Sequence, residues 1–266
     1  MDSAANSATE AFRILAVIPT LAQRLDTLAR TLASIETQSG VQVDTVIVAK
    51  DATPALADLA RRHGARVVTH PGHISAAVNA GFAQATPAHR YALWIGDDDL
   101  LRPDALATAS ALLEADLSAV ACYGDCDYID IQGNLLFTRT PPELSPTLLQ
   151  FVPGLIKQET CLFRYRALVD CGGLDESLRY TMDLDLLLKL RRQGRFVKAR
   201  RVQAAFCWHA GSLTIANRDA SLSEAQSVQL RNARGLTRLL QPIWKHPIRW
   251  LIVTMTRKIN RGMSQA

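Results

Sequence analysis

YALWIGDDD, residues 91–99, joins an apolar run to one glycine and three consecutive carboxylates. The run has the length and composition of a strand buried on both faces, so the aspartates follow directly where that strand ends. Three like charges in one short turn repel one another, and a divalent cation, a positive ligand or open solvent must relieve the repulsion. The segment therefore predicts either a metal-binding turn or an acidic, solvated turn before the next helix.

The N-terminal half alternates between strand and helix patterns. Apolar runs at 13–19, 43–48 and 65–69 alternate with helical spacing of apolar residues over 25–35, 54–63 and 75–84. This order predicts an α/β fold with a mostly parallel, Rossmann-like sheet flanked by helices. Because ligands bind beyond the carboxyl ends of such strands, we expect Pro19, Thr20, Asp51 and the three aspartates at one edge.

The second half has a different rhythm. Strands are predicted at 119–123 and 128–131, with a hairpin turn at 132–134 that leads into 135–138. A further strand at 160–164, a helix over 182–192 and two short strands around Phe196 and Phe206 follow. We interpret these strands as a smaller, mixed sheet beside the first one.

Composition narrows the class of protein. A chain of 266 residues with 48% hydrophobic content can bury one main core. The five cysteines are odd in number and show no zinc-like spacing, which favours reduced thiols in a cytoplasmic protein. We expect no signal peptide, no transmembrane span and no nucleic-acid partner.

The net charge of +5 is unevenly distributed. Eight basic residues and no acidic one follow Glu224, so residues 1–224 carry 22 Lys and Arg against 25 Asp and Glu. The tail also has apolar residues at helical spacing from Trp244 to Ile259. A basic amphipathic helix of this kind could lie on the inner, anionic face of the plasma membrane, or pack on the body of the protein or on a second copy in a homo-oligomer.

A series of motifs resembles the inverting glycosyltransferases of family 2, which have the nucleotide-diphospho-sugar transferase fold, also called type A. The matching segments in the first half are 18–20, several positions within 28–38, 72–81 and 94–101, and the third of them ends in Asn79-Ala80-Gly81. Those in the second half are 123–130, 172–178, 182–186 and 209–212. The resemblance covers about residues 12–215. It implies a flexible segment at 1–11, a nucleotide-binding half at 12–100, an acceptor half at 101–215 and a basic helical tail at 216–266.

The resemblance also implies roles for individual residues. Asp99 would bind a divalent metal, Mn²⁺ or Mg²⁺, and Asp98 would contact the ribose or the donor sugar. Asp97, Pro19, Thr20 and Asp51 would belong to the donor site, although Asp97 could equally be a turn-stabilising residue.

Two further roles concern the acceptor side. Asp183 matches the catalytic base, which takes a proton from the acceptor hydroxyl. It could also simply cap its helix, and Asp185 is the alternative base. His209 would reach the metal or the diphosphate, or else serve a structural role beside Trp208.

Two positions depart from the family pattern. Met182 stands where the family usually has an acidic residue, and Val78 stands where an arginine is common. The prediction is a metal-dependent enzyme that transfers a sugar, from UDP or dTDP first of all, to a saccharide or lipid-linked saccharide. The rivals are a catalytically inactive relative that serves in binding or assembly, and a sugar-1-phosphate nucleotidyltransferase, which should have a glycine-rich loop where Pro19-Thr20-Leu21-Ala22 stands.

Overall fold

A computed structural model describes residues 12–208, 217–235 and 238. Its strands are β1 (Arg13–Thr20), β2 (Gln42–Ala49), β3 (Arg66–Thr69), β4 (His89–Trp94), β5 (Leu100–Leu101), β6 (Ala119–Ile129), β7 (Leu135–Arg139), β8 (Leu162–Arg164) and β9 (Arg195–Cys207). Its helices are α1 (Leu25–Glu36), α2 (Pro54–Arg62), α3 (Ile74–Phe82), α4 (Ala105–Ala115), α5 (Ser145–Leu148), the 3-10 turn η1 (Gln158–Thr160), α6 (Tyr165–Asp170), α7 (Met182–Leu190) and α9 (Arg218–Asn232).

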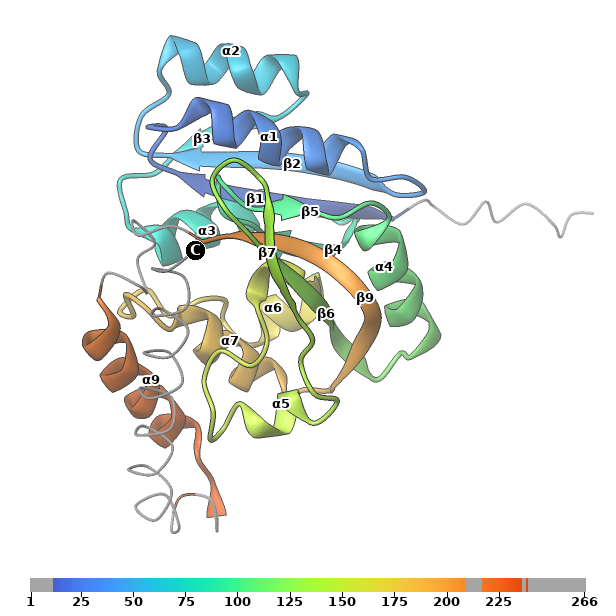
Figure 1. The fold of residues 1–266 in the computed structure, drawn as a ribbon, viewed down its shortest axis with the longest axis vertical. Coiled ribbons are helices and arrows are strands. Elements are labelled where there is room, and N and C mark those ends of the chain that lie inside the picture. Colours follow the sequence, from blue (N-terminus) through green and yellow to red (C-terminus); the bar gives the residue numbers. More distant parts are fainter. Residues whose placement is uncertain (1–11, 209–216, 236–237, 239–266) are drawn as a thin grey trace, which may run out of the picture.

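The strands join in one sheet in the order β3-β2-β1-β4-β8-β6-β9-β5, with β7 paired to β6 (Figure 1). β3, β2, β1 and β4 are parallel, as the alternating pattern predicted. β8 runs antiparallel between β4 and β6 and connects the two halves. The mixed strands of the acceptor side therefore extend the N-terminal sheet instead of forming a separate one.

Helices cover both faces of the sheet, and each face has its own apolar core. Leu28, Leu32, Leu56 and Leu106 bury α1, α2 and α4 against one face. Side chains of α3, α6, α7 and α9 fill the other face, Val228 of α9 among them. Burying one such leucine contributes about 1.5–3 kcal/mol, so these helical stripes set which face each helix covers.

Two predicted pairs of strands are single long strands. β6 continues through Asp125 and Asp127, and β9 continues through Arg200 and Arg201. The register between them shifts next to Asp125, which bends both strands and interrupts the apolar pattern. Asp127 is tolerated inside the strand because Arg102 pairs with it and Thr138 donates a hydrogen bond to it.

The fold brings the ends of β1 and β4 to the same edge, beside the end of β9. In the described residues, no helix combines the length and hydropathy that a membrane span requires. The apolar and basic pattern predicted for 244–259 lies outside the described residues.

Candidate active site

The acidic turn, residues 97–99, follows β4 at the carboxyl edge of the parallel strands. The Ile95 amide donates to the Val17 carbonyl at 3.0 Å, which keeps the chain paired with β1 one residue past β4. The Asp99 amide then donates to the Gly96 carbonyl at 3.3 Å. A Cβ at Gly96 would lie 2.7 Å from Asp99 Oδ2, so glycine is required for this carboxylate to fold back over the turn.

Asp97 and Asp98 face the loop that joins β1 to α1. The Thr20 hydroxyl donates to Asp97 Oδ2 at 2.5 Å, and it accepts a hydrogen bond from the Ala22 amide. An Arg24 guanidinium nitrogen lies 3.3 Å from Asp97 Oδ1 and 2.9 Å from Asp98 Oδ2. Burial raises the pKa of Asp97, although the Thr20 hydroxyl and the Arg24 cation oppose the rise. Thr20 and two of the predicted aspartates therefore do lie together.

Asp99 points into the protein. It is 4% exposed, and its Oδ1 accepts a hydrogen bond from the Cys207 amide at 2.8 Å. Its carbonyl accepts another from the Thr31 hydroxyl at 2.8 Å, which anchors the turn on α1. Burial raises the pKa of Asp99 well above its usual range, and the charges of Glu159 and Asp98 raise it further. A nearby positive charge would stabilise the ionised form of this side chain.

An ion pair of the buried Glu159 and the partly buried Lys157 lies next to this carboxylate. Lys157 Nζ lies 3.4 Å from Glu159 Oε1 and 3.5 Å from the centre of the Phe206 ring. Burial alone would lower the pKa of Lys157, but the charge of Glu159, with smaller contributions that include Asp99, raises it, so the lysine is a cation. Glu159 is 5% exposed, and its Oε2 has no hydrogen-bond partner within the described part of the chain.

Sequence reasoning missed this pair and Arg24. A signal for the pair exists, because Lys157 and Glu159 are the only charged residues between Glu143 and Arg164. Two charges of opposite sign, two residues apart in an otherwise uncharged segment, indicate a paired and buried position.

Asp183 is the second residue of α7 and is partly exposed. Removal from water raises its pKa, while the Leu184 amide and the Lys157 cation oppose the rise and Glu159 adds to it. Asp183 and Asp99 thus both interact electrostatically with the Lys157–Glu159 pair. The acidic turn and the start of α7 therefore lie in one region of the molecule.

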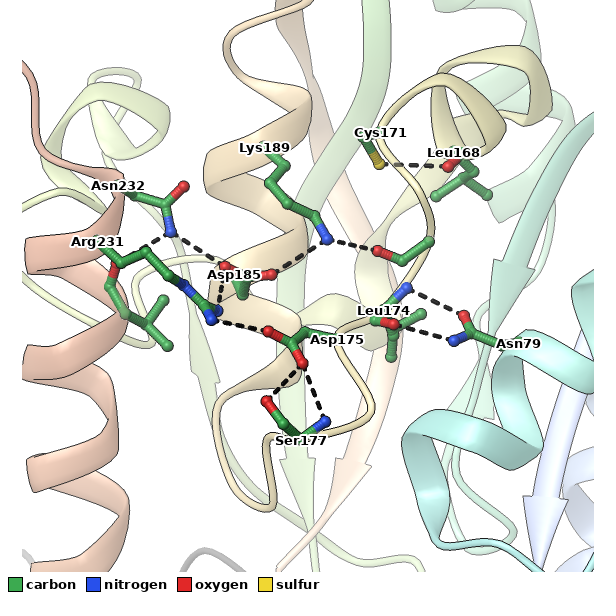
Figure 2. A network of polar contacts seen from close by, with 12 residues as sticks. Asn79, Leu168, Cys171, Leu174, Asp175, Ser177, Asp185, Lys189, Arg231 and Asn232 are labelled. Atoms are coloured by element: carbon green, nitrogen blue, oxygen red, sulfur yellow. Dashed lines mark hydrogen bonds and ion pairs between the residues drawn. The ribbon is translucent and has the colours of Figure 1, made fainter.

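Asp185, the alternative base, has a different environment (Figure 2). It is 2% exposed, and its Oδ1 accepts hydrogen bonds from an Arg231 guanidinium nitrogen at 2.9 Å and from Asn232 Nδ2 at 3.0 Å. Lys189 Nζ lies 3.2 Å from its Oδ2. Its carboxylate is therefore enclosed by α9 and by the next turn of its own helix.

The Asn79-Ala80-Gly81 motif has a supporting role. Asn79 accepts a hydrogen bond from the Leu174 amide at 3.0 Å and donates one to the Leu174 carbonyl at 2.9 Å (Figure 2). A second Nδ2 contact reaches Glu176 Oε1 at 2.9 Å. Gly81 allows α3 to approach β1, since a Cβ there would lie 2.3 Å from Val17. The motif thus holds the 172–181 loop that leads into α7.

The remaining predicted residues lie further out or beyond the described residues. Pro19 lies within β1, paired in register with β2. Asp51 is exposed in the loop after β2, at the same edge as Thr20. Val78 and Met182, which depart from the family pattern, are both buried in the apolar core. His209 lies outside the described residues.

The acidic turn suits a hard divalent cation. Its carboxylate oxygens are ligands that Mg²⁺ and Mn²⁺ prefer. Burial raises the pKa of Asp97 and Asp99, and the charge of Asp98 raises both further, so a cation there would favour their ionised forms. Within residues 12–208 and 217–235, no group of three His, Cys, Asp or Glu side chains is arranged to hold an ion.

Comparison with known proteins gives one family. A family model described as Glycosyl transferase family 2 matches residues 16–160, more than half of the chain. The O-antigen biosynthesis protein RfbC of Myxococcus xanthus is 26% identical over 212 residues. That match covers 77% of this chain but only 16% of RfbC, so the chain spans a small part of that relative.

Solved structures of glycosyltransferases have the same fold. The mannosyltransferase PcManGT from Pyrobaculum calidifontis, in complex with GDP-Man and Mn²⁺, superposes with a TM-score of 0.65 at 16% identity, over 96% of this chain and 76% of its own. S. aureus TarS 1-349 in complex with UDP-GlcNAc gives a TM-score of 0.64 at 14% identity, over 83% of this chain and 66% of the TarS chain. At these identities the likeness is one of fold.

Proposed function

The chain belongs to glycosyl transferase family 2, and we propose that it is a metal-dependent, inverting enzyme that moves a sugar from a nucleotide diphosphate to an acceptor hydroxyl. The observation that carries this proposal is the acidic turn at the carboxyl edge of the parallel strands, where Thr20 and Arg24 hold Asp97 and Asp98 beside the end of β1. A turn in this place suits the donor diphosphate, and Asp183 at the start of α7 is the candidate base. Similarity to an O-antigen biosynthesis protein supports polysaccharide or glycolipid assembly as the setting.

The proposed reaction assigns a role to each group. Asp183 accepts the proton of the acceptor hydroxyl while the hydroxyl oxygen forms a bond to the anomeric carbon. The bond from that carbon to the diphosphate breaks on the opposite side, which inverts the configuration. Asp97, Asp98 and Asp99 bind the donor side, with Thr20 orienting Asp97. A divalent metal, when bound there, would supply positive charge to the leaving diphosphate.

A raised pKa suits a general base only within limits. A carboxylate with a higher pKa accepts a proton more readily, but it must be ionised at the working pH. Because burial raises the pKa of Asp183, we expect activity to fall on the acid side as this group becomes protonated. The base assignment favours Asp183 over Asp185 because Asp185 already binds Arg231, Asn232 and Lys189.

The donor test uses isothermal titration. Wild type and Asp99→Ala are titrated with UDP and with dTDP, each with and without Mn²⁺. GDP is titrated in the same way, as the nucleotide that the prediction does not favour. We expect metal-dependent binding by wild type and a loss of at least about tenfold in affinity for the variant, because a metal contact is removed. Asp130→Ala is a matched control, since Asp130 is engaged in the hairpin turn with Asn134. Equal affinity in wild type and Asp99→Ala would exclude the metal role of Asp99.

The inactive-relative alternative is separated by turnover. An inactive relative would bind a nucleotide sugar without hydrolysing or transferring it. Val78 and Met182 favour this alternative because they stand where the family usually has an arginine and an acidic residue. Both side chains, however, pack in the apolar core. A screen of sugar nucleotides with Mn²⁺, read out by nucleotide release, decides between the two.

A further inference from the structure

α9 reaches the start of α7 through one carboxylate. Glu224 Oε1 accepts a hydrogen bond from the Arg179 amide at 3.0 Å. Its Oε2 accepts from the Tyr180 amide at 2.7 Å, the Thr181 amide at 2.8 Å and the Thr181 hydroxyl at 3.0 Å. One side chain from α9 thus binds three consecutive amides directly before α7.

These hydrogen bonds are strong because the acceptor is charged. Burial alone would raise the pKa of Glu224, but the hydrogen bonds from Arg179, Tyr180 and Thr181 outweigh it and lower the pKa, so the group remains a carboxylate. Charge-assisted hydrogen bonds are roughly twice as strong as neutral ones. An anion at a helix N-terminus also interacts favourably with the helix dipole. Thr181, the N-cap residue, makes no side-chain cap of its own, so Glu224 takes that role from another helix.

The rest of the 172–181 loop is held from both sides (Figure 2). On the α3 side, Asn79 holds the Leu174 backbone by two hydrogen bonds. On the α9 side, a guanidinium nitrogen of Arg231 lies 2.8 Å from Asp175 Oδ2. The loop therefore has two fixed attachments before Glu224 holds its last three residues.

The direction of Asp183 depends on where α7 begins. Asp183 is two residues past Thr181, and a slip of one residue at a helix start rotates each side chain by about 100°. We propose that Glu224 is a positioning residue for Asp183, because it fixes the residues from which α7 starts. This inference rests on the proposed function, in which Asp183 is the base. A misplacement of about 1 Å can cost on the order of a hundredfold in rate.

The test compares Glu224→Gln with a matched variant on the same helix. Gln229 is 7% exposed and donates to the Leu149 carbonyl at 2.9 Å, so Gln229→Ala removes another buried anchor of α9, one that does not bind residues 179–181. Glu224→Gln keeps the size of the side chain but removes the charge and replaces one of the two acceptor oxygens by an amide donor. Hydrogen exchange is measured at the amides of residues 179–181, together with kcat, donor KM and Tm.

We expect Glu224→Gln to speed exchange at the three amides and to lower kcat by about 10- to 100-fold, with donor KM changed by less than about threefold. Gln229→Ala should lower Tm at least as much, with kcat within about twofold of wild type. If Glu224→Gln does not fold, Thr181→Val removes one of the four hydrogen bonds and should lower kcat less but in the same direction.

Three results would overturn the inference. Faster exchange with an unchanged kcat would mean that loosening these amides does not move the base. An equal loss of kcat in Gln229→Ala would mean that the stability of α9 alone matters. A wild-type chain without turnover on any nucleotide sugar would overturn the proposed function and the role of Asp183 with it, whereas the first two results leave that function standing.

Discussion

Asp183 and Asp185 stand two residues apart on α7, and their substitutions are expected to have opposite effects. Asp185→Asn removes a buried charge that Arg231 and Lys189 share. Breaking a buried ion pair typically costs about 3–5 kcal/mol. Here Arg231, with a side chain 50% exposed, keeps Asp175 as a partner, and Lys189 keeps the Gly173 carbonyl at 2.7 Å. We therefore expect Asp185→Asn to lower the free energy of unfolding by about 2–3 kcal/mol, which is less than the usual value because solvent screens the half-exposed Arg231.

Asp183→Asn should leave stability equal or higher. Folding raises the pKa of Asp183, so the ionised form is less favourable in the folded chain than in the unfolded one. Its cost to stability is absent below the ordinary carboxyl pKa and grows as the pH rises through the raised pKa. The neutral amide removes this cost, and the stability of the variant should depend less on pH over that window. Turnover, in contrast, should fall by about 10²–10⁴-fold, which is the usual contribution of a general base.

The assay combines thermal and urea denaturation at several pH values with steady-state transfer of the sugar. Asp185→Asn should show a Tm lower by about 5–10 °C and keep its turnover at temperatures where it is folded. Asp183→Asn should bind the donor with wild-type affinity and show no loss of Tm. The reasoning is refuted if Asp185→Asn loses turnover while its stability is unchanged, or if Asp183→Asn retains turnover.

Two further predictions test the buried pair and the loop. Lys157→Met leaves the charge of Glu159 buried without its cation, so the free energy of unfolding should fall by about 3–5 kcal/mol. Adding Glu159→Leu should restore most of this stability. A loss below about 1 kcal/mol for Lys157→Met alone, measured in urea, would contradict the prediction. Both Gly172, with a φ of +79°, and Gly173, with a φ of +66°, have a backbone conformation that strains an alanine. A Cβ at Gly173 would also lie 2.7 Å from Asn79 Oδ1, whereas one at Gly172 would meet open space. Gly173→Ala should therefore lower the free energy of unfolding by about 1–3 kcal/mol more than Gly172→Ala. Equal thermal unfolding of the two glycine variants would show that Asn79 does not hold the loop.

Much of the fold could be predicted from local pattern. The parallel strands β1 to β4 and the helices between them match apolar runs and helical spacing in neighbouring residues. The continuous strands β6 and β9 could not be predicted in this way. Asp125 and Asp127 interrupt the apolar run of β6, and their partners Thr140, Arg102 and Thr138 come from other elements.

In the candidate site, too, some contacts could be predicted from the sequence and others could not. Thr20, Asp97 and Asp98 meet because the ends of adjacent parallel strands share an edge, which topology makes predictable. Lys157 and Glu159 were missed because a charged pair in a coil segment carries no periodic signal. The uncharged segment around them indicates a paired position, but it does not specify which distant groups the pair meets.

The order of residues determined the acidic turn and the strand before it, because apolar runs and adjacent charges are properties of neighbours in the chain. Only the tertiary structure gives Asp183 and Asp185 different surroundings. Both aspartates lie in the first turn of one helix, and nothing local separates them. Arg231, 46 residues further along the chain, binds Asp185 and leaves Asp183 with the Lys157–Glu159 pair. The physical reason is that a side chain's charge state and accessibility depend on which distant groups pack against it, and those groups meet only on folding.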